Sequence, residues 1–523
     1  MVARQAGFGA IAGGASWQPK YGIVGGDRRF RPWEAPIYSA LVDRTKLTFA
    51  AVVTGYFLVM FAVSPVSVVM PTLAAGFGVG MEQASWVMTA YLLPLTAFLL
   101  PAGRLGDILG HRRLFTIGIG IGTVASLLAG LAPSLWLLLA ARALQGIGAA
   151  MVSATSLPII TEAVSDTRRG RSVGLVTMAS STGAMAGTAL APLYVQYLDW
   201  RWAFYSAALA GLVSLVLALQ MGNDARRAVK ARLDWPGAAL LLMTLTVASI
   251  SLSHFHEGPE TFQDGWAWHV PMHGAALVLL LMFLAVERRV KSPLVELRHL
   301  ANGRFTSAIG ANLVLHMTMM VAVFSVPFLV QRGLGLSPVQ TGILLTTMQA
   351  STTAMTLVGG WLYDRMNSRW LCPASLAMVA SGLTALGFAG ESITYGRAFI
   401  LILWMGIGSG CFMTTNNTRI MSALAGEYRG FASGMLETSR QYGHTLGVAV
   451  AATGLTAALA ATGAVPAFEQ EAAVRAGFAQ SSLLAGVICW VGVLLAAYPL
   501  KRVVASAPAF SPSVRPALAE SVT

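Results

Sequence analysis

The sequence predicts an all-α integral membrane protein with fourteen transmembrane helices. Its 523 residues are 55% hydrophobic and only 11% charged, whereas soluble domains carry about 25% charged residues. Apolar runs of about 20 residues recur along the chain, and this length lets a helix cross a hydrocarbon core of ~30 Å. A short basic hairpin also occurs twice between such runs. These three observations place most of the chain in lipid.

The apolar runs define the spans in chain order. We expect them at 48–70, 87–103, 114–132, 135–160, 172–194, 202–221, 236–253, 270–286, 305–330, 338–360, 371–389, 398–418, 432–458 and 480–500. The only cysteines, Cys372, Cys411 and Cys489, each lie inside a run. They indicate buried apolar filler and no disulfide framework or metal cluster.

The basic hairpin is the most informative segment. Residues 103–113 read GRLGDILGHRR, between the second and third runs, and residues 360–369 read GWLYDRMNSR, after the tenth. Both fit the pattern G-x-L-x-D-x-x-x-x-R, which predicts two related halves. We therefore divide the chain into an N-terminal arm, a six-helix bundle, a linker with two extra helices, a second six-helix bundle and a tail. The expected bounds are 1–46, 47–221, 222–304, 305–503 and 504–523.

The net charge of +13 is distributed by topology. With these spans, 29 of the 35 Lys and Arg residues fall on the side of the N-terminus. The positive-inside rule then places both termini, and therefore the arm and the tail, in the cytoplasm. The arm has no compact apolar stretch with a cleavage site, so it does not resemble a signal peptide. The basic excess therefore predicts no nucleic-acid partner.

Further motifs occur in order between about residues 48 and 450. They are RALQGIGAA at 142–150, DWRWAF at 199–204, LDWPG at 233–237, PLVEL at 293–297, RGFASG at 429–434 and RQYGHTLG at 440–447. With the two hairpins, the chain resembles the major facilitator superfamily, and its fourteen spans resemble the drug:proton antiporter family of multidrug-resistance-type exporters. The resemblance implies two bundles that alternate access, and export of a small amphipathic organic compound in exchange for protons across the bacterial inner membrane. It implies no cofactor, and the sequence carries no phosphate loop, metal cluster or nucleophile constellation of an enzyme.

The resemblance assigns the hairpins to a gate at the cytoplasmic side. Asp107 and Asp364 would each reach the positive N-terminal end of a helix in the opposite bundle. Gly103 and Gly110 would permit close helix approach. Arg112 would meet lipid phosphates or carboxylates, or serve only to fix topology, and Arg365 would stand beside Asp364.

Ionisable residues inside the spans are the candidates for proton coupling. Arg142 lies about two turns into the fourth span, where an unpaired charge costs at least a few kcal/mol. It is interpreted either as part of the coupling machinery or as a structural arginine that binds carbonyls between helices. In the thirteenth span, Glu437, Arg440, Gln441 and His444 share one helical face, which predicts a cavity-facing stripe or a satisfied helix entrance. His316 in the ninth span is interpreted as a substrate or proton site, or as a packing residue.

The candidates for lining a substrate cavity are polar or adaptable residues of four spans. Gln145 belongs to the motif of the fourth span, Asn416 and Asn417 follow a Gly-rich run in the twelfth, and Met320 belongs to a methionine cluster in the ninth. Gln441 belongs to the polar stripe of the thirteenth. The bland alternative for each is ordinary helix packing.

Two departures from the family pattern put proton coupling in question. Ala62 stands where the family carries an aspartate in the first span, and no other acid lies in that span. In the fifth span, Thr188 replaces the motif proline, and Pro192 follows at a displaced position. A proton-independent facilitator and a non-transporting membrane sensor or scaffold therefore stay as alternatives. Without the usual acid, the substrate is expected to be neutral or anionic.

Overall fold

The computed structural model describes residues 34–164, 169–222, 234–253, 266–290, 293–366, 370–425, 428–461 and 471–498. The tail and residues 1–33 of the predicted arm lie outside this part. The long helices are α1 (Glu34–Phe61), α2 (Ser64–Phe77), α3 (Met81–Leu109), α4 (His111–Leu131), α5 (Leu135–Ala163), α6 (Arg169–Tyr197), α7 (Trp202–Leu219), α8 (Trp235–Ser253), α9 (Trp266–Glu287), α11 (Gly303–Phe328), α12 (Pro338–Met366), α13 (Leu371–Ala389), α14 (Tyr395–Ser422), α15 (Arg429–Ala461) and α16 (Glu471–Ala497). A single-turn helix, α10 (Leu297–Leu300), precedes α11. With α1 and α2 taken as one interrupted span, these helices match the fourteen predicted spans.

Ten of these spans are long and apolar enough to cross a membrane by length and composition alone. Three of the others, α6, α12 and α15, carry polar residues because they line the contact between the two halves of the molecule. The fourth, α8, has a shorter apolar stretch, Trp235–Ala248. The all-helical membrane fold expected from the sequence is confirmed.

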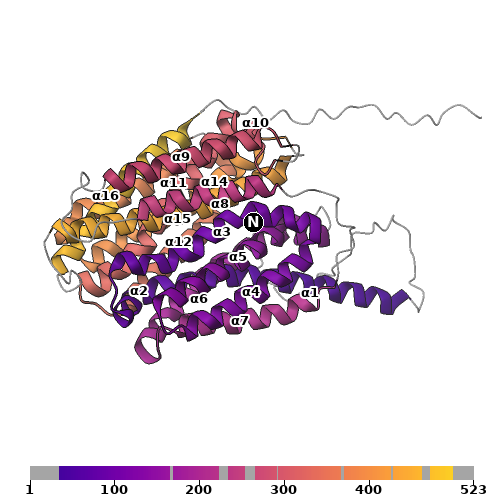
Figure 1. Cartoon of the computed structure of the whole chain (residues 1–523), viewed down its shortest axis with the longest axis horizontal. Coiled ribbons are helices and arrows are strands. Elements are labelled where there is room, and N and C mark those ends of the chain that lie inside the picture. The colour runs from indigo at the N-terminus through magenta and orange to yellow at the C-terminus, as the bar shows by residue number, and fades with distance from the viewer. Residues whose placement is uncertain are drawn as a thin grey trace, which may run out of the picture.

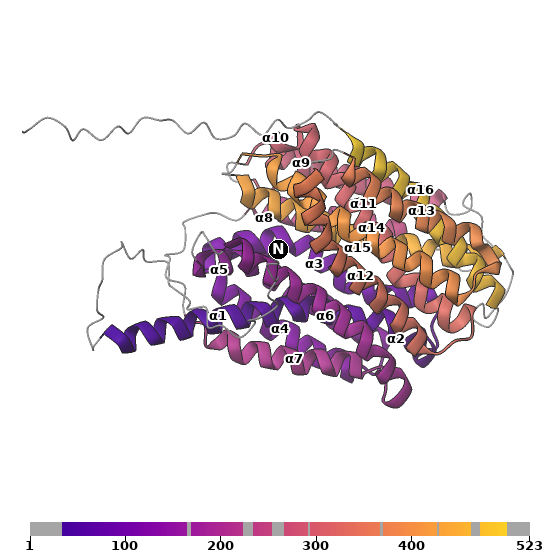
Figure 2. The same cartoon turned by 180° about the vertical axis from the view of Figure 1, so that it is seen from behind.

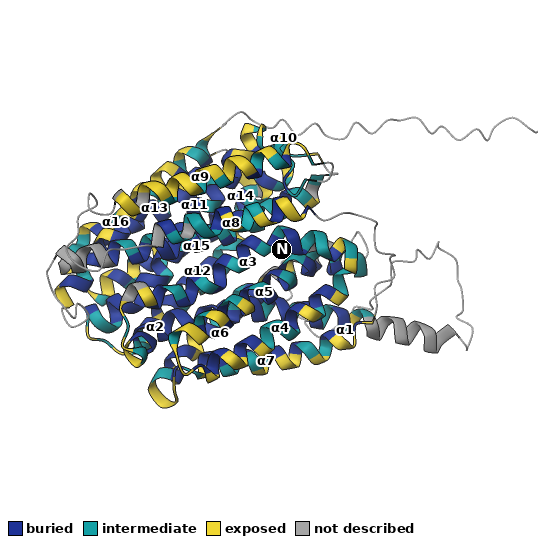
Figure 3. Ribbon diagram, in the orientation of Figure 1, coloured by how far each residue is buried: buried dark blue, intermediate teal, exposed yellow. Residues whose placement is uncertain are grey.

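The helices form two groups that lie side by side, α1–α7 and α11–α16 (Figures 1 and 2). The two extra helices pair with each other, and α8 also packs against α3 and α15, one helix from each group. Helices at the periphery expose large apolar side chains, as the yellow stripes of α7, α9 and α16 show (Figure 3). Leu209, Leu281 and Leu494 are examples, each more than half exposed. Such apolar surfaces suit contact with lipid tails.

The first span is broken in its middle. Pro65 has no backbone N–H, so it cannot continue the helical ladder, and the N–H of Val66 turns back to the Val63 carbonyl at 3.1 Å. The break leaves the carbonyl oxygen of Ala62 available to another partner. The same span also begins earlier than expected, because α1 starts at Glu34, inside the predicted arm. The apolar run marks only the part of a helix that crosses the lipid, and the helix itself can continue into polar residues.

Glycines set the closest helix crossings. A Cβ on Gly183 of α6 would overlap the Phe57 carbonyl oxygen of α1, and one on Gly187 would lie 2.8 Å from Pro65 Cδ. These glycines of the altered fifth-span motif therefore hold α6 against the broken first span. In the second group, Gly443 and Gly447 bring α15 onto the backbone of α11 in the same way.

The two halves meet at the end of the molecule opposite the 103–113 hairpin, which we call the far end. There the Thr188 and Thr346 hydroxyl oxygens lie 3.2 Å apart, and Gln331 Nε2 donates to the Val68 carbonyl at 3.0 Å. A Cβ on Gly342 would overlap Pro192 Cγ. Both altered residues of the fifth-span motif, Thr188 and Pro192, are thus contacts between the halves.

The opposite end, which carries the hairpin and which we call the hairpin end, is more open. A Cβ built on Gly103 in the last turns of α3, or on Gly174 or Gly430 near the starts of α6 and α15, would meet no described atom within 4 Å. The halves are therefore in contact at the far end, whereas these three glycines of the hairpin end are not packed against the opposite half. The expected close approach at Gly103 does not occur in this arrangement.

Candidate functional site

A charged pair lies between the two halves in the first third of α15. Glu437 and Arg440 form a salt bridge along one face of the helix, and Arg440 Nη2 also donates to the Tyr56 hydroxyl of α1 at 2.9 Å. Both charged side chains are about 15% exposed. Glu437 lies eight residues beyond Arg429, about 12 Å into the helix at 1.5 Å per residue. Opposite charges this deep compensate each other, because an isolated charge would cost several kcal/mol.

Hydrogen bonds extend this pair toward α11. Gln441 Nε2 donates to Glu437 Oε1 at 2.7 Å, and Gln441 Oε1 lies 3.3 Å from His444 Nδ1. The other ring nitrogen of His444, Nε2, lies 3.2 Å from His316 Nδ1 on α11. The structure therefore brings together four of the five predicted proton-coupling candidates, namely Glu437, Arg440, His444 and His316. Gln441 joins them as a connecting residue.

The fifth candidate, Arg142, lies apart from this group and inside the N-terminal group of helices. Its guanidinium donates to the carbonyls of Val87 at 2.9 Å and Ala62 at 3.2 Å, and to Gln145 Oε1. Its Cζ atom also stacks over the Tyr91 ring, 4.3 Å from the centroid. The residue is fully buried, and within the described chain its Nη2 atom has no hydrogen-bond partner. These contacts fit the structural interpretation of Arg142, because it caps the carbonyl that the break in the first span exposes.

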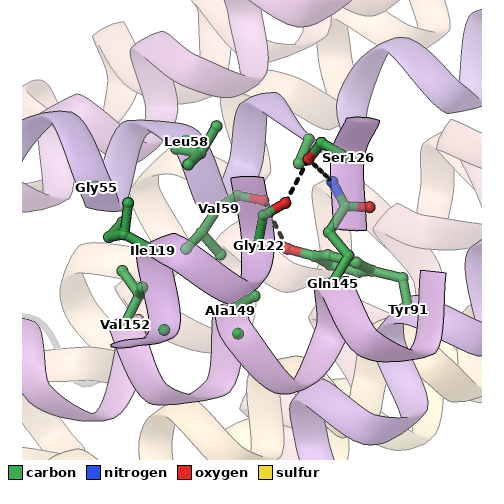
Figure 4. A pocket seen from close by; sticks show the side chains of 13 residues that line it. Gly55, Leu58, Val59, Tyr91, Ile119, Gly122, Ser126, Gln145, Ala149 and Val152 are labelled. Atoms are coloured by element: carbon green, nitrogen blue, oxygen red, sulfur yellow. Dashed lines mark hydrogen bonds between the residues drawn. The ribbon is translucent and has the colours of Figure 1, made fainter. Parts of the chain in front are cut away.

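A small cavity adjoins Arg142's partners (Figure 4). It lies among α1, α3, α4 and α5, and Ala62, Tyr91, Ser126 and Gln145 contribute to its lining. Gln145 Nε2 donates to Ser126 Oγ at 2.7 Å, and Tyr91 Oη donates to the Val59 carbonyl at 3.0 Å. The position where the family carries its first-span acid therefore borders a cavity with few polar atoms. It lies close to Arg142, which has no carboxylate partner among the described residues.

The other substrate-cavity candidates are engaged inside the C-terminal group. Asn416 Nδ2 donates to the Ala308 carbonyl at 2.9 Å, and Met320 packs against the backbone at Gly447. Asn417 is half-buried on the next position of α14. Gln441 is occupied by Glu437 and His444. Their roles toward a substrate stay predictions.

The hairpin residues contact their own half of the molecule. Asp107 lies 3.6 Å from Arg104 and 3.4 Å from His111. Arg112 Nη1 donates to the Met221 carbonyl just beyond α7, at 2.7 Å. Its expected contact with lipid phosphates or carboxylates stays a prediction. Gly110 adopts φ of 96° at the turn, which L side chains rarely accept. The latch across the halves is thus a prediction for a state whose hairpin end is closed.

The second hairpin is described only in part. Arg365 stacks on Trp361, with its Cζ 5.3 Å from the ring centroid. The side chain of Asp364 lies outside the described residues, as do residues 367–369.

Sequence reasoning missed three features of the site. Tyr56 and Tyr91 had no signal, because an aromatic residue in an apolar span is ordinary. Asp234 and Glu287, at the start of α8 and the end of α9, are buried acids with one oxygen each, Asp234 Oδ2 and Glu287 Oε1, that finds no partner in the described chain. Both oxygens lie close to Gly237, and a separation of 53 residues gives no sign of this proximity in the sequence.

Two groups of membrane helices with a charged pair at their contact are an arrangement suited to a membrane transporter. The model of the Major Facilitator Superfamily matches residues 52–448. The chain belongs to that superfamily, and it is a multi-pass membrane transporter.

Its relatives include exporters. The chain is 30% identical over 424 residues to the multidrug resistance protein Stp of Mycobacterium tuberculosis, covering 80% of this chain and 77% of that protein. It is 31% identical over 416 residues to the cephamycin export protein CmcT of Amycolatopsis lactamdurans, covering 76% and 83%. The predicted membership of the drug-exporter branch is confirmed.

Solved structures support the fold. A bacterial homologue of the human lysosomal transporter Spinster, in an inward-facing and unoccupied conformation, has a TM-score of 0.61 at 14% identity, covering 87% of this chain and 96% of that chain. A D-xylose–proton symporter has a TM-score of 0.57 at 14% identity, covering 85% and 97%. At this identity the likeness concerns the fold alone.

Proposed function

We propose that the protein exports a small amphipathic organic compound across the bacterial inner membrane in exchange for protons. The bundles 47–221 and 305–503 would rock about the central contact as alternating access requires. Both termini would lie in the cytoplasm, so the hairpin end is the cytoplasmic end. The open hairpin end and the closed far end then correspond to a cytoplasm-facing state.

The observation that carries this proposal is the Glu437–Arg440 pair bound to Tyr56. Glu437 is the acid that replaces the missing first-span aspartate. A proton on Glu437 removes the charge that compensates Arg440, and the strength of the Arg440–Tyr56 contact between the halves changes with it. A proton can therefore bias the balance between two arrangements, because it interacts differently with each. Lipid headgroups would border the basic hairpin end.

The relatives support the direction of transport. Stp is named for multidrug resistance and CmcT for cephamycin export. For this chain, a neutral or anionic compound suits a core in which Arg142 has no carboxylate partner in the described structure.

Efflux of fluorescent amphiphiles from bacteria that lack their own pumps tests the proposal. The wild type is compared with Glu437→Gln, each with and without a protonophore. Glu471→Gln is the matched control, because Glu471 also pairs with an arginine, Arg475, but at the exposed far end. We expect the protonophore and Glu437→Gln to abolish efflux, and Glu471→Gln to leave it unchanged.

Other outcomes select the alternatives. Efflux that a protonophore stops but Glu437→Gln spares would retain antiport and remove Glu437 as its acid. Efflux that ignores both would identify a proton-independent facilitator. A sensor or scaffold would tolerate loss of Asp107, whereas a transporter that uses the predicted gate would not.

A further inference from the structure

We infer that Glu437, Gln441, His444 and His316 form a hydrogen-bond chain whose direction is set by the proton on Glu437. The chain would report the state of an acid on α15 to a histidine on α11. This inference rests on the proposed function only in taking Glu437 as the group that gains and loses the proton.

The direction with ionised Glu437 follows from donor and acceptor chemistry. A carboxylate only accepts, so Gln441 must turn its NH₂ group toward Glu437 Oε1, 2.7 Å away. Its carbonyl oxygen, Oε1, then faces His444, and His444 Nδ1 must donate to it. A neutral imidazole carries one N–H. His444 Nε2 is therefore an acceptor, and His316 Nδ1 must be the donor to it across 3.2 Å.

Protonation of Glu437 permits the opposite direction. A carboxylic acid donates to the carbonyl oxygen of a flipped Gln441 amide, and the NH₂ group of Gln441 then faces His444 Nδ1. The proton on His316 Nδ1 passes to His444 Nε2 along their hydrogen bond. His444 releases its Nδ1 proton to solvent, and His316 takes up one proton from solvent on Nε2, so each ring again carries one proton. Each ring has the same charge in both directions. An amide does not readily pass a proton on, so the chain transmits polarity and not the proton itself.

The surroundings favour a change of polarity over a movement of the helices. Gly443 and Gly447 press α15 onto the backbone of α11 on either side of His444. His316 is 7% exposed and Gln441 is fully buried. In the described chain, the other ionisable groups facing these residues are Arg440 on α15 and Tyr56 on α1. No second acid competes there with Glu437.

The consequence concerns recognition. The chain occupies His316 Nδ1 in both directions, so Nε2 is the nitrogen that can present the change to a ligand. It is an acceptor while Glu437 is ionised and a donor once Glu437 is protonated. His316 would then be a positioning residue that favours a hydroxyl or N–H group of a neutral compound only in the deprotonated state, which is the competition that antiport requires.

Nitrogen NMR of ¹⁵N-histidine-labelled protein in lipid nanodiscs tests the inference, because the two tautomers give distinct ring-nitrogen signals. His316→Gln and His444→Gln assign the resonances. In the wild type we expect both rings to carry their proton on Nδ1 at high pH and to convert together to Nε2 as pH falls. His273 is the internal control. Its Nδ1 lies 2.7 Å from the Ser251 hydroxyl, and it does not belong to this hydrogen-bond chain.

Glu437→Gln gives the sharpest arm. Arg440 donates to one oxygen of Glu437 and Gln441 to the other. In the variant, Arg440 should hold the amide oxygen, which turns the new NH₂ group toward Gln441. We expect both rings to be locked in the Nε2–H form at every pH at which they stay neutral. Gln441→Leu should uncouple the two rings from Glu437.

Three results would overturn the inference: unchanged tautomers in Glu437→Gln, independent conversion of the two rings, or an imidazolium signal in place of a tautomer change. If Glu437→Gln does not fold, the wild-type pH series decides alone. Locked tautomers in Glu437→Gln, together with wild-type efflux that ignores protonophores, would contradict proton export and support the hydrogen-bond chain. Unchanged tautomers together with protonophore-sensitive efflux would support proton export and contradict the hydrogen-bond chain.

Discussion

The Arg440 guanidinium of α15 donates a hydrogen bond of 2.9 Å to the Tyr56 hydroxyl of α1 and so joins the two halves of the transporter. The residues are 384 positions apart. The bond lies beside a pair of opposite charges, Glu437 and Arg440, whose side chains are about 15% exposed within the spans.

Replacement of Tyr56 by Phe should weaken the state that is open at the hairpin end. A hydrogen bond to a charged group contributes about 1.5 kcal/mol or more, which is roughly a tenfold change in an equilibrium constant. Spin labels on Gly103→Cys and Gly430→Cys would measure the populations, because both positions face open space. Tyr197→Phe, at a residue 70% exposed at the far end, should leave them unchanged. Equal populations in Tyr56→Phe and the wild type would refute a role for this bond.

A disulfide between the halves at the far end should stop transport. The Thr188 and Thr346 oxygens are 3.2 Å apart, so Thr188→Cys with Thr346→Cys should cross-link in mild oxidant. The bond would hold the far end closed and prevent alternating access. We expect efflux by the double variant to fall to background in oxidant and to recover with reductant. Efflux by either single variant should change with neither oxidant nor reductant. Full efflux from cross-linked protein would exclude opening at this place.

Arg142→Lys should lower the thermal midpoint of unfolding. An ammonium group cannot reach the Val87 and Ala62 carbonyls and Gln145 together while stacking on Tyr91. Each carbonyl left without a partner costs about 1–3 kcal/mol. Differential scanning fluorimetry in detergent measures the loss, with Arg397→Lys, at the exposed start of α14, as the control. Unchanged stability with lost proton dependence of efflux would favour the coupling interpretation instead.

Glu287→Gln should stabilise the protein. The free oxygens Glu287 Oε1 and Asp234 Oδ2 converge on Gly237, where a Cβ would lie 2.9 Å from the first and overlap the second. Val295 N–H holds the other Glu287 oxygen at 3.1 Å, so in the variant the amide NH₂ group would face Asp234. Satisfying one buried acceptor and removing one charge should contribute about 1 kcal/mol or more. Glu296→Gln, at an exposed pair with Arg298, should not raise the midpoint. A lower midpoint for Glu287→Gln would show that the two acids share a stabilising proton.

The helical spans could be predicted because lipid leaves the backbone few choices. Runs of about 20 apolar residues must form helices there, since each unpaired N–H or C=O costs several kcal/mol. Span boundaries were less accurate, since α3 and α15 run several residues past their apolar cores. The contact between Arg142 and the Ala62 carbonyl escaped prediction. A proline within a span indicates that a carbonyl is freed, but it does not indicate which residue binds that carbonyl.

The sequence by itself therefore determined the membrane class, the order of the spans, the twofold hairpin and the single face that Glu437, Arg440, Gln441 and His444 share, because these follow from local periodicity. Only the tertiary structure decided that this face meets Tyr56 and His316, that Arg142 binds carbonyls away from it, and that Thr188 contacts Thr346. Those pairings join residues up to 384 positions apart, and helix packing, not local sequence, brings them within hydrogen-bond distance.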